Sequence, residues 1–161
     1  MRPMMEVVRR KFGRKNLVGA EIGVQRGYHA KSVLRNFSIT ELVLVDVWNS
    51  DISNPKRSGK AIKTVNPGAD VHYPMMMKQV GHEPNVVVRR MRSEDACKLY
   101  DDEYFDFVYI DASHAYEGVS TDCRCWYPKV KVNGIIGGHD YFDYLGCQEA
   151  VQEFIKINAL T

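Results

Sequence analysis

Five short apolar runs, at residues 17–23, 41–46, 85–91, 105–111 and 134–138, alternate along this chain with segments whose apolar residues recur at helical spacing. The run ELVLVD, which ends at Asp46, is almost continuously apolar, as is typical of a strand covered on both faces. Alternation of this kind predicts a parallel sheet with right-handed crossovers and helices on both faces. A ligand binds such a sheet outside the carboxyl ends of its strands, so we look for function where each strand ends.

The segments between the strands predict helices with recognisable limits. A first helix follows Pro3 and stops near Gly13, Ser93 has the character of an N-cap, and a short helix is expected at residues 73–80. Residues 49–69 contain scarcely an apolar residue and predict a long surface loop that helps to select a substrate. The remaining helices are expected around the apolar sets Ala30, Val33, Leu34 and Phe37; Ala96, Leu99 and Tyr100; Val119, Cys123 and Trp126; and Ala150, Val151, Phe154 and Ile155.

Length and charge exclude several classes of protein. The chain has 161 residues, enough for one core, and no linker or repeat divides it, so we expect a single domain over residues 1–161. The net charge is +2 and the basic clusters lack interleaved aromatic residues, which argues against a nucleic-acid partner. No stretch approaches the roughly 18 to 20 apolar residues that cross a bilayer. The four cysteines form no CxxC pair, and the N-terminal segment carries charges where a signal peptide needs its apolar run, so the cytoplasm is the expected location.

The ends of the first two strands indicate a nucleoside ligand. The first strand runs into EIGVQRG, where Gly23 and Gly27 stand at the corners of a turn that a ligand can approach closely. Asp46 lies 23 residues after Gly23, the place of a ribose-binding acid in a βαβ nucleotide unit. The GxxxG spacing lacks the dinucleotide fingerprint, and Glu21 beside the turn would repel phosphate. A net positive ligand such as S-adenosylmethionine suits acids at Glu21 and Asp46 better.

The most specific segment is FDFVYIDASHAYEGV at residues 105–119, followed by Asp122, Trp126 and GGHDY at residues 137–141. With it the sequence resembles the class I S-adenosylmethionine-dependent methyltransferases, and within them the small-molecule branch called methyltransferase family 24, over about residues 18–154. The resemblance implies that the methionine end of the cofactor is lined by Glu21, Gly23 and Gly27, the ribose hydroxyls are held by Asp46, the adenine is flanked by Ser93 and Glu94, and the sulfonium and acceptor lie near Asp111.

The same resemblance suggests a base and a metal. Macrolide-sugar O-methyltransferases with a similar segment use its Asp for magnesium and its His as the base, which would map onto Asp111 and His114, with His139 and Asp140 as further ligands. Neighbouring strands lie about 4.8 Å apart, so Asp111 and Asp140 can converge on one hard cation, while His114 could take the proton of the acceptor. His139 stands where a second acid is expected, which leaves the metal open between magnesium, zinc, iron and none.

We therefore predict a Rossmann-like, doubly wound α/β domain with strand order 3-2-1-4-5 that moves the methyl group of S-adenosylmethionine to an oxygen or nitrogen of a small-molecule acceptor. One alternative is a NAD-dependent oxidoreductase on a similar fold, and another is a non-catalytic nucleoside-binding module. The two strands that usually end class I methyltransferases are not apparent before Thr161. Either the fifth strand is an exposed edge that a partner subunit covers, which makes a homodimer the expectation, or the chain is a shortened version whose acceptor site is open.

Overall fold

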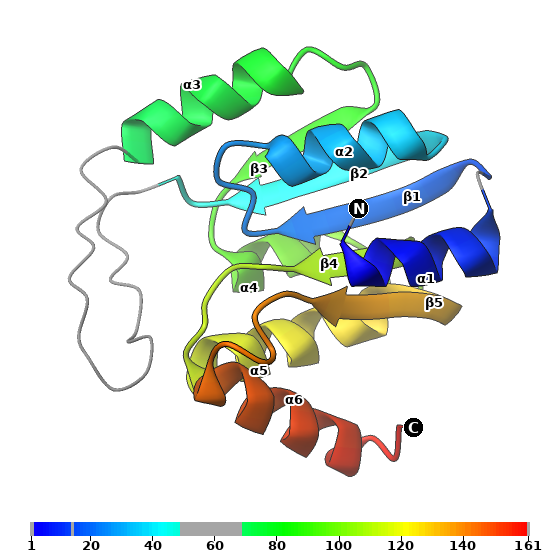
Figure 1. The fold of residues 1–161 in the computed structure, drawn as a ribbon, viewed down its shortest axis with the longest axis vertical. Coiled ribbons are helices and arrows are strands. Elements are labelled where there is room, and N and C mark those ends of the chain that lie inside the picture. The colour runs from blue at the N-terminus through cyan, green and yellow to red at the C-terminus, as the bar shows by residue number, and fades with distance from the viewer. Residues whose placement is uncertain (1, 14, 49–68, 161) are drawn as a thin grey trace.

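A computed structural model of the chain describes residues 2–13, 15–48 and 69–160; all but the last residue of the predicted loop at 49–69 lies outside them. One parallel sheet runs through the described part of the chain (Figure 1). Its strands are β1 (Leu17–Ile22), β2 (Ile39–Asp46), β3 (Val86–Arg90), β4 (Phe105–Ile110) and β5 (Val130–Gly138). Their order is β3-β2-β1-β4-β5, which confirms the predicted topology.

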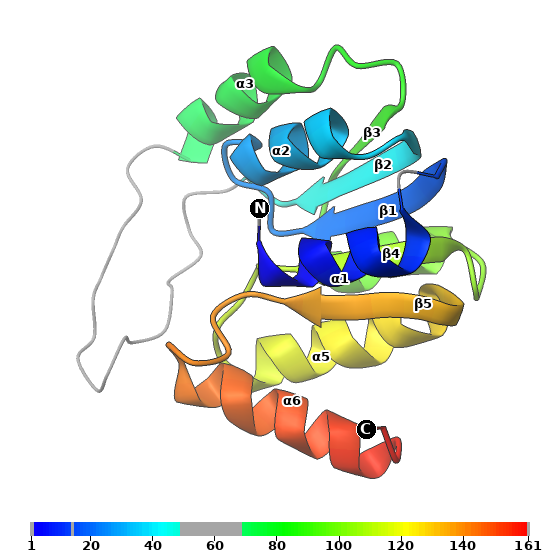
Figure 2. The same cartoon turned by 45° about the vertical axis from the view of Figure 1, so that its right-hand side comes forward.

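Helices cover both faces of this sheet (Figures 1 and 2). One face carries α1 (Pro3–Phe12), α2 (Tyr28–Asn36) and α3 (Ala69–Gln79). The other carries α4 (Ser93–Ala96) with the 3-10 turn η1 (Cys97–Leu99), then α5 (Tyr116–Trp126) with η2 (Tyr127–Lys129), and α6 (Leu145–Ile157). No helix in the described ranges is both long enough and apolar enough to span a membrane.

The interior strand β2 lies between β3 and β1, and its surroundings explain why its apolar run is continuous. Leu42 and Leu44 pack into the core beneath α1, α2 and α3, whereas Val43 and Val45 pack into the core beneath α4, α5 and α6. All four side chains are almost completely buried, since successive residues of a strand point to opposite faces and both faces are covered here. Burial of each such side chain is worth roughly 1.5–3 kcal/mol, so this strand fixes both layers at once.

Several predicted boundaries are wrong. β5 begins at Val130 rather than at 134, because its first half is partly exposed at the sheet edge and lacks an apolar pattern. α3 begins at Ala69 rather than at 73 and contains Pro74. Phe37 is buried but lies just beyond the end of α2, in an extended conformation. Ser93 is not an N-cap, since Arg92 holds that position and the Ser93 hydroxyl donates to Asp122 instead.

Candidate functional site

A cavity of about 450 Å³ lies where β1, β2 and β4 end, facing α4 and α5. This is the edge of a parallel sheet at which ligands bind, and the volume is that of an ordinary small-molecule pocket. Among the described residues that line it, five carry carboxyl groups and two carry basic side chains. The acids are Asp46, Glu94, Asp111, Glu117 and Asp122, and the basic residues are Arg92 and His72.

Gly23 allows the ends of β1 and β4 to meet. Its φ is +86°, and a Cβ atom there would lie 2.2 Å from the carbonyl oxygen of Asp111. The Asp111 amide in turn donates to the carbonyl of Ile22 over 2.7 Å. A glycine is therefore required at this corner for close packing of two backbones as well as for access by a ligand.

Asp46 organises the turn that follows β1. Its Oδ2 atom accepts hydrogen bonds from the backbone amides of Val24 and Gln25, each 2.9 Å long, and its Oδ1 atom accepts one from the amide of Trp48 at 2.8 Å. A carboxylate offers about four acceptor positions, so one position on Oδ1 remains, on a residue that lines the cavity. That position could receive a ribose hydroxyl, as the sequence predicts.

Glu21 and Gly27 do not line the cavity. Glu21 pairs in register with Leu44, and strand alternation turns both toward the α2 layer, whereas Ile22 faces the cavity. The Glu21 side chain is 3% exposed and lies 3.1 Å from Nδ1 of His29, and its burial raises the pKa of the carboxyl. Gly27, with φ +75°, precedes α2 and packs against α3. Both residues therefore support the turn from the side of α2 and α3 rather than from the cavity.

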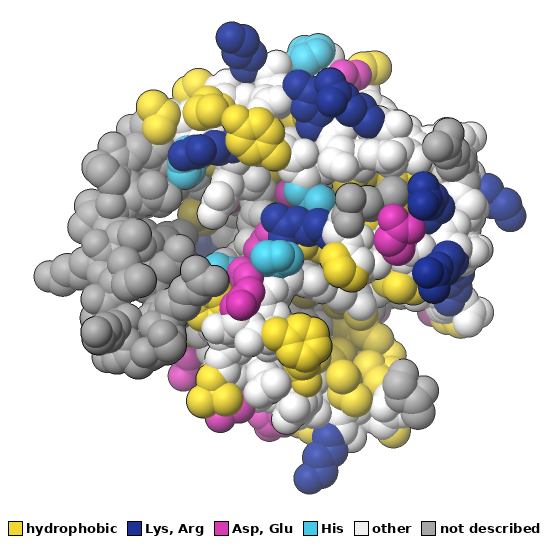
Figure 3. Space-filling model, viewed as in Figure 1, with side chains coloured by type: hydrophobic (Ala, Val, Ile, Leu, Met, Phe, Trp, Pro, Cys, Tyr) yellow, Lys and Arg dark blue, Asp and Glu magenta, His cyan; other side chains and the backbone are white. Residues whose placement is uncertain are grey.

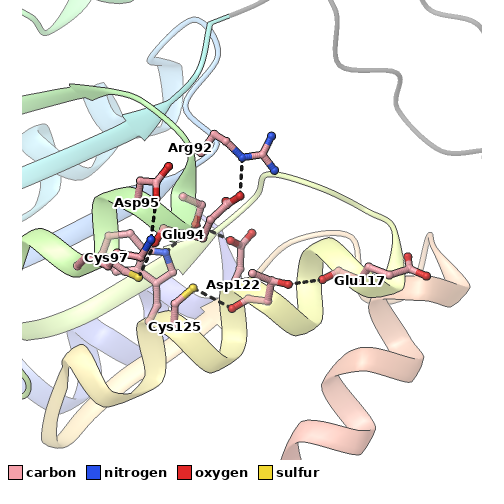
Figure 4. Close-up of polar contacts among 11 residues, drawn as sticks. Arg92, Glu94, Asp95, Cys97, Glu117, Asp122 and Cys125 are labelled. Carbon is pink, nitrogen blue, oxygen red and sulfur yellow. Dashed lines mark hydrogen bonds and ion pairs between the residues drawn. The ribbon is translucent and has the colours of Figure 1, made fainter.

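The α4–α5 wall contains the predicted residues Ser93 and Glu94, and it brings in Asp122 (Figure 4). The Ser93 hydroxyl donates to Oδ1 of Asp122 and accepts a 2.8 Å hydrogen bond from Nε1 of Trp126. Glu94 is bonded to Arg92, which lowers the pKa of its carboxyl. Asp122 was absent from the predicted site, although helical spacing places it one turn after Gly118 on the same face of α5.

A second cluster joins the ends of β4 and β5. One ligand atom from each of Asp111, His139 and Asp140 lies within 4.8 Å of the others, so the predicted convergence is observed. His139 Nδ1 is 2.8 Å from Oδ1 of Asp140 and 3.9 Å from Oδ1 of Asp111. Two carboxylates and an imidazole form a donor set that fits a divalent cation.

The cluster is already partly neutralised by the protein itself. Arg2 places Nη1 2.9 Å from Oδ2 of Asp111 and donates to the hydroxyl of Tyr109 over 2.7 Å. Burial raises the pKa of Asp111, while Arg2 and His139 oppose that rise. Histidine, acidic and basic side chains accordingly gather near the centre of the face shown in Figure 3. A metal ion would have to share Asp111 with Arg2, and no local sequence pattern predicts this contact.

His114 lies against the same cluster. Its Nε2 atom is 2.8 Å from Oδ2 of Asp140, but the carboxylate lies off the N–H direction, so neither ring nitrogen has a hydrogen bond within the described residues. The ring stacks on Tyr144 with 4.4 Å between centroids and 14° between planes. The imidazole is thus held in place with both nitrogens buried and without a hydrogen bond, beside a carboxylate that would stabilise its protonated form.

Comparison with known proteins agrees with this architecture. Residues 20–141 match the sequence model of methyltransferase family 24, described as a methyltransferase domain, which confirms the resemblance drawn from the sequence. A leucine–tRNA ligase from Methanothermobacter thermautotrophicus is 34% identical over 56 residues, which are 33% of this chain and only 6% of the ligase.

Solved structures share the fold at low sequence identity. A spermidine synthase from Thermotoga maritima superposes with a TM-score of 0.58 at 15% identity, covering 91% of this chain and 47% of its own. A structure described as a putative S-adenosylmethionine-dependent methyltransferase from Listeria monocytogenes gives 0.55 at 12%, covering 83% and 50%. A protein described in the same way from Methanococcus maripaludis gives 0.57 at 16%, covering 98% and 64%. The chain thus spans about half to two thirds of the length of these proteins.

Proposed function

Because this chain belongs to methyltransferase family 24, a family of class I S-adenosylmethionine-dependent methyltransferases, we propose that it transfers the methyl group of S-adenosylmethionine to an oxygen or nitrogen of a small-molecule acceptor. The observation that carries the proposal is the acid-lined cavity at the carboxyl ends of the strands, where Gly23, Asp46 and Asp111 meet.

The charge of the cavity supports this cofactor over a nicotinamide dinucleotide. S-adenosylmethionine carries a sulfonium, an ammonium and one carboxylate and is net positive, whereas a dinucleotide brings a pyrophosphate. Five carboxyl groups line the cavity, and among the described residues only Arg92 and His72 carry basic side chains there. Like charges in a pocket of reduced dielectric repel strongly, so the dinucleotide is disfavoured.

The residues at the β4 and β5 ends serve two tasks in this proposal, and Asp140 takes part in both. The bound cofactor supplies an electrophilic methyl group, and the protein holds it in line with the acceptor. His114 removes the proton from the attacking hydroxyl or amine, and Asp140 stabilises the imidazolium that forms. Asp111, His139 and Asp140 would hold a divalent cation, which would polarise an acceptor hydroxyl.

Calorimetric titration tests the cofactor directly. S-adenosylmethionine, S-adenosylhomocysteine and NAD are each titrated into the protein with and without magnesium, and into the Asp46→Ala variant. The proposal expects the first two to bind and the variant to lose that binding. Binding of NAD alone would refute the methyltransferase function, and binding of none of the three would favour the non-catalytic module.

A second experiment tests His114. Formation of S-adenosylhomocysteine is followed with a panel of phenols, sugars and amines, for the wild type, His114→Ala and a control, His82→Ala, whose ring is exposed after α3. Loss of a general base lowers turnover by about 10²–10⁴-fold, so His114→Ala should do so while still binding S-adenosylhomocysteine. Unchanged turnover in His114→Ala would exclude the base.

We also infer that two copies pair through β5. This strand forms an edge of the described sheet, and Val132 on it is 72% exposed. Sedimentation of the wild type and of Val132→Lys measures the oligomeric state. A monomer in both cases would exclude the pairing.

A further inference from the structure

Asp122 is a buried carboxyl group that the proposed catalytic steps do not use. Only 4% of the residue is exposed, yet it lines the cavity, and Figure 4 shows it on α5 facing Glu94 and Arg92 at the start of α4. Its Oδ1 atom accepts the hydrogen bond of Ser93. Its Oδ2 atom has no hydrogen-bond partner among the described residues.

A buried carboxyl with one unused oxygen is unfavourable unless something else bonds to it. The neighbouring charges do not compensate it, because Glu94 on α4 is also acidic and the nearby Cys123 and Cys125 on α5 are not cationic. Oδ2 is not among the buried polar atoms that lack a partner, so it opens to the cavity that Asp122 lines, where a ligand can supply the donor.

The position of Asp122 indicates which part of the ligand it meets. Asp46, at the end of β2, is the ribose-binding acid, while Ser93, Glu94 and Asp122 form the wall between α4 and α5. Apolar side chains, including Met91 and Ala112, also line this cavity and suit the face of a flat ring. A nucleoside whose ribose lies at Asp46 therefore directs its base toward Asp122.

We propose that Asp122 selects the base of the cofactor by accepting, at its free Oδ2 atom, a hydrogen bond from the 6-amino group of adenine. This inference rests on the proposed function. A base with a 6-oxo group would place an acceptor against the carboxylate and be rejected, because two acceptors facing each other leave both unpaired.

The network predicts the outcome of a single isosteric change. The Ser93 hydroxyl accepts a hydrogen bond from Nε1 of Trp126, so its own proton is donated to the side chain at position 122. In Asp122→Asn the amide oxygen must then take the place of Oδ1, and the amide nitrogen takes the place of Oδ2. The group that meets the base changes from acceptor to donor, so the variant should prefer a 6-oxo base.

The test is titration of S-adenosylhomocysteine and S-inosylhomocysteine into the wild type, Asp122→Asn and the control Asp95→Asn, whose carboxyl is exposed and bonded to Lys98. A site built around one hydrogen bond strongly rejects a ligand that lacks it, so we expect the wild type and the control to prefer the adenine compound by at least about tenfold. Asp122→Asn should lose or reverse that preference. The same preference in all three proteins would overturn the inference and leave Asp122 as a tie between α4 and α5.

A measurement on the wild type keeps the inference testable if the variant does not fold. Burial raises the pKa of Asp122 to about 6, so protonation of Oδ2 at pH 5 turns the acceptor into a donor. The ratio of the two affinities should fall between pH 8 and pH 5, and Glu94 does not cause this fall, because its bond to Arg92 lowers its pKa and keeps it ionised over this range. A constant ratio would overturn the inference. If neither compound binds the wild type, the proposed function fails and the inference with it.

Discussion

Replacement of Asp122 by asparagine should make the protein more stable, and increasingly so as the pH rises. Burial, opposed by the hydrogen bond from Ser93, raises the pKa of Asp122 from 3.8 to about 6. Between these values the folded protein keeps a proton that the unfolded chain has released. The free energy of unfolding therefore falls as pH rises, by about 1.4 kcal/mol per pH unit and about 3 kcal/mol in all.

Asparagine keeps the shape of the side chain and the acceptor for Ser93 but cannot ionise, so the variant escapes this loss. We expect Asp122→Asn to exceed the wild type in free energy of unfolding by about 1.5 kcal/mol at pH 5 and about 3 kcal/mol at pH 7.5. Urea unfolding at both pH values, followed by the fluorescence of the buried Trp126 beside Ser93, measures the difference. Asp95→Asn is the control and should show neither effect. The reasoning would be refuted if the difference in free energy of unfolding between the variant and the wild type did not increase with pH, or if the variant were less stable than the wild type at pH 7.5.

Three further substitutions test the site geometry. Gly23→Ala places a Cβ atom 2.2 Å from the Asp111 carbonyl at a φ of +86°, and should lower the free energy of unfolding in urea by about 3 kcal/mol. Asp46→Ala removes the acceptor of three backbone amides, so we expect a loss of about 1–3 kcal/mol together with weaker binding of S-adenosylhomocysteine in calorimetry. Arg2→Ala frees one oxygen of Asp111, and the Kd for magnesium should fall about tenfold, whereas Arg9→Ala, on the exposed side of α1, should leave it unchanged.

The topology could be predicted because burial on both faces leaves a clear trace in sequence. Leu42, Val43, Leu44 and Val45 are apolar without interruption, which only a strand between two helical layers requires. The start of β5 left no such trace, since residues 131–134 lie at an edge of the sheet where solvent tolerates polar side chains. Edge strands are read from sequence less well than central ones for this reason.

The site could be predicted as far as parallel strands determine it. Asp111 and Asp140 end neighbouring strands and do lie together, as their positions required. Glu21 was expected at the cavity but faces α2. The alternation of side chains along β1 is consistent with this orientation, but the prediction was based on the neighbouring glycine turn instead. Asp122 reaches the site from α5 and Arg2 from the extended residue before α1. Arg2 contacts Tyr109 across 107 residues of sequence, so no local pattern could have placed it.

The carboxyl groups of the cavity fall into two sets: those with a hydrogen-bonding or cationic partner in the protein, and those without a cationic partner among the described residues. Asp46 is bonded to backbone amides, Glu94 to Arg92, and Asp111 to Arg2. Glu117 and Asp122, both on α5, have no cationic partner in the part of the chain that the structure describes. Glu117 is exposed and hydrated, so the deficit lies at the buried Asp122, which a cationic nucleoside with a donor on its base relieves and a pyrophosphate does not. The buried acid of α5, more than the glycine turn, therefore favours S-adenosylmethionine over NAD in this fold.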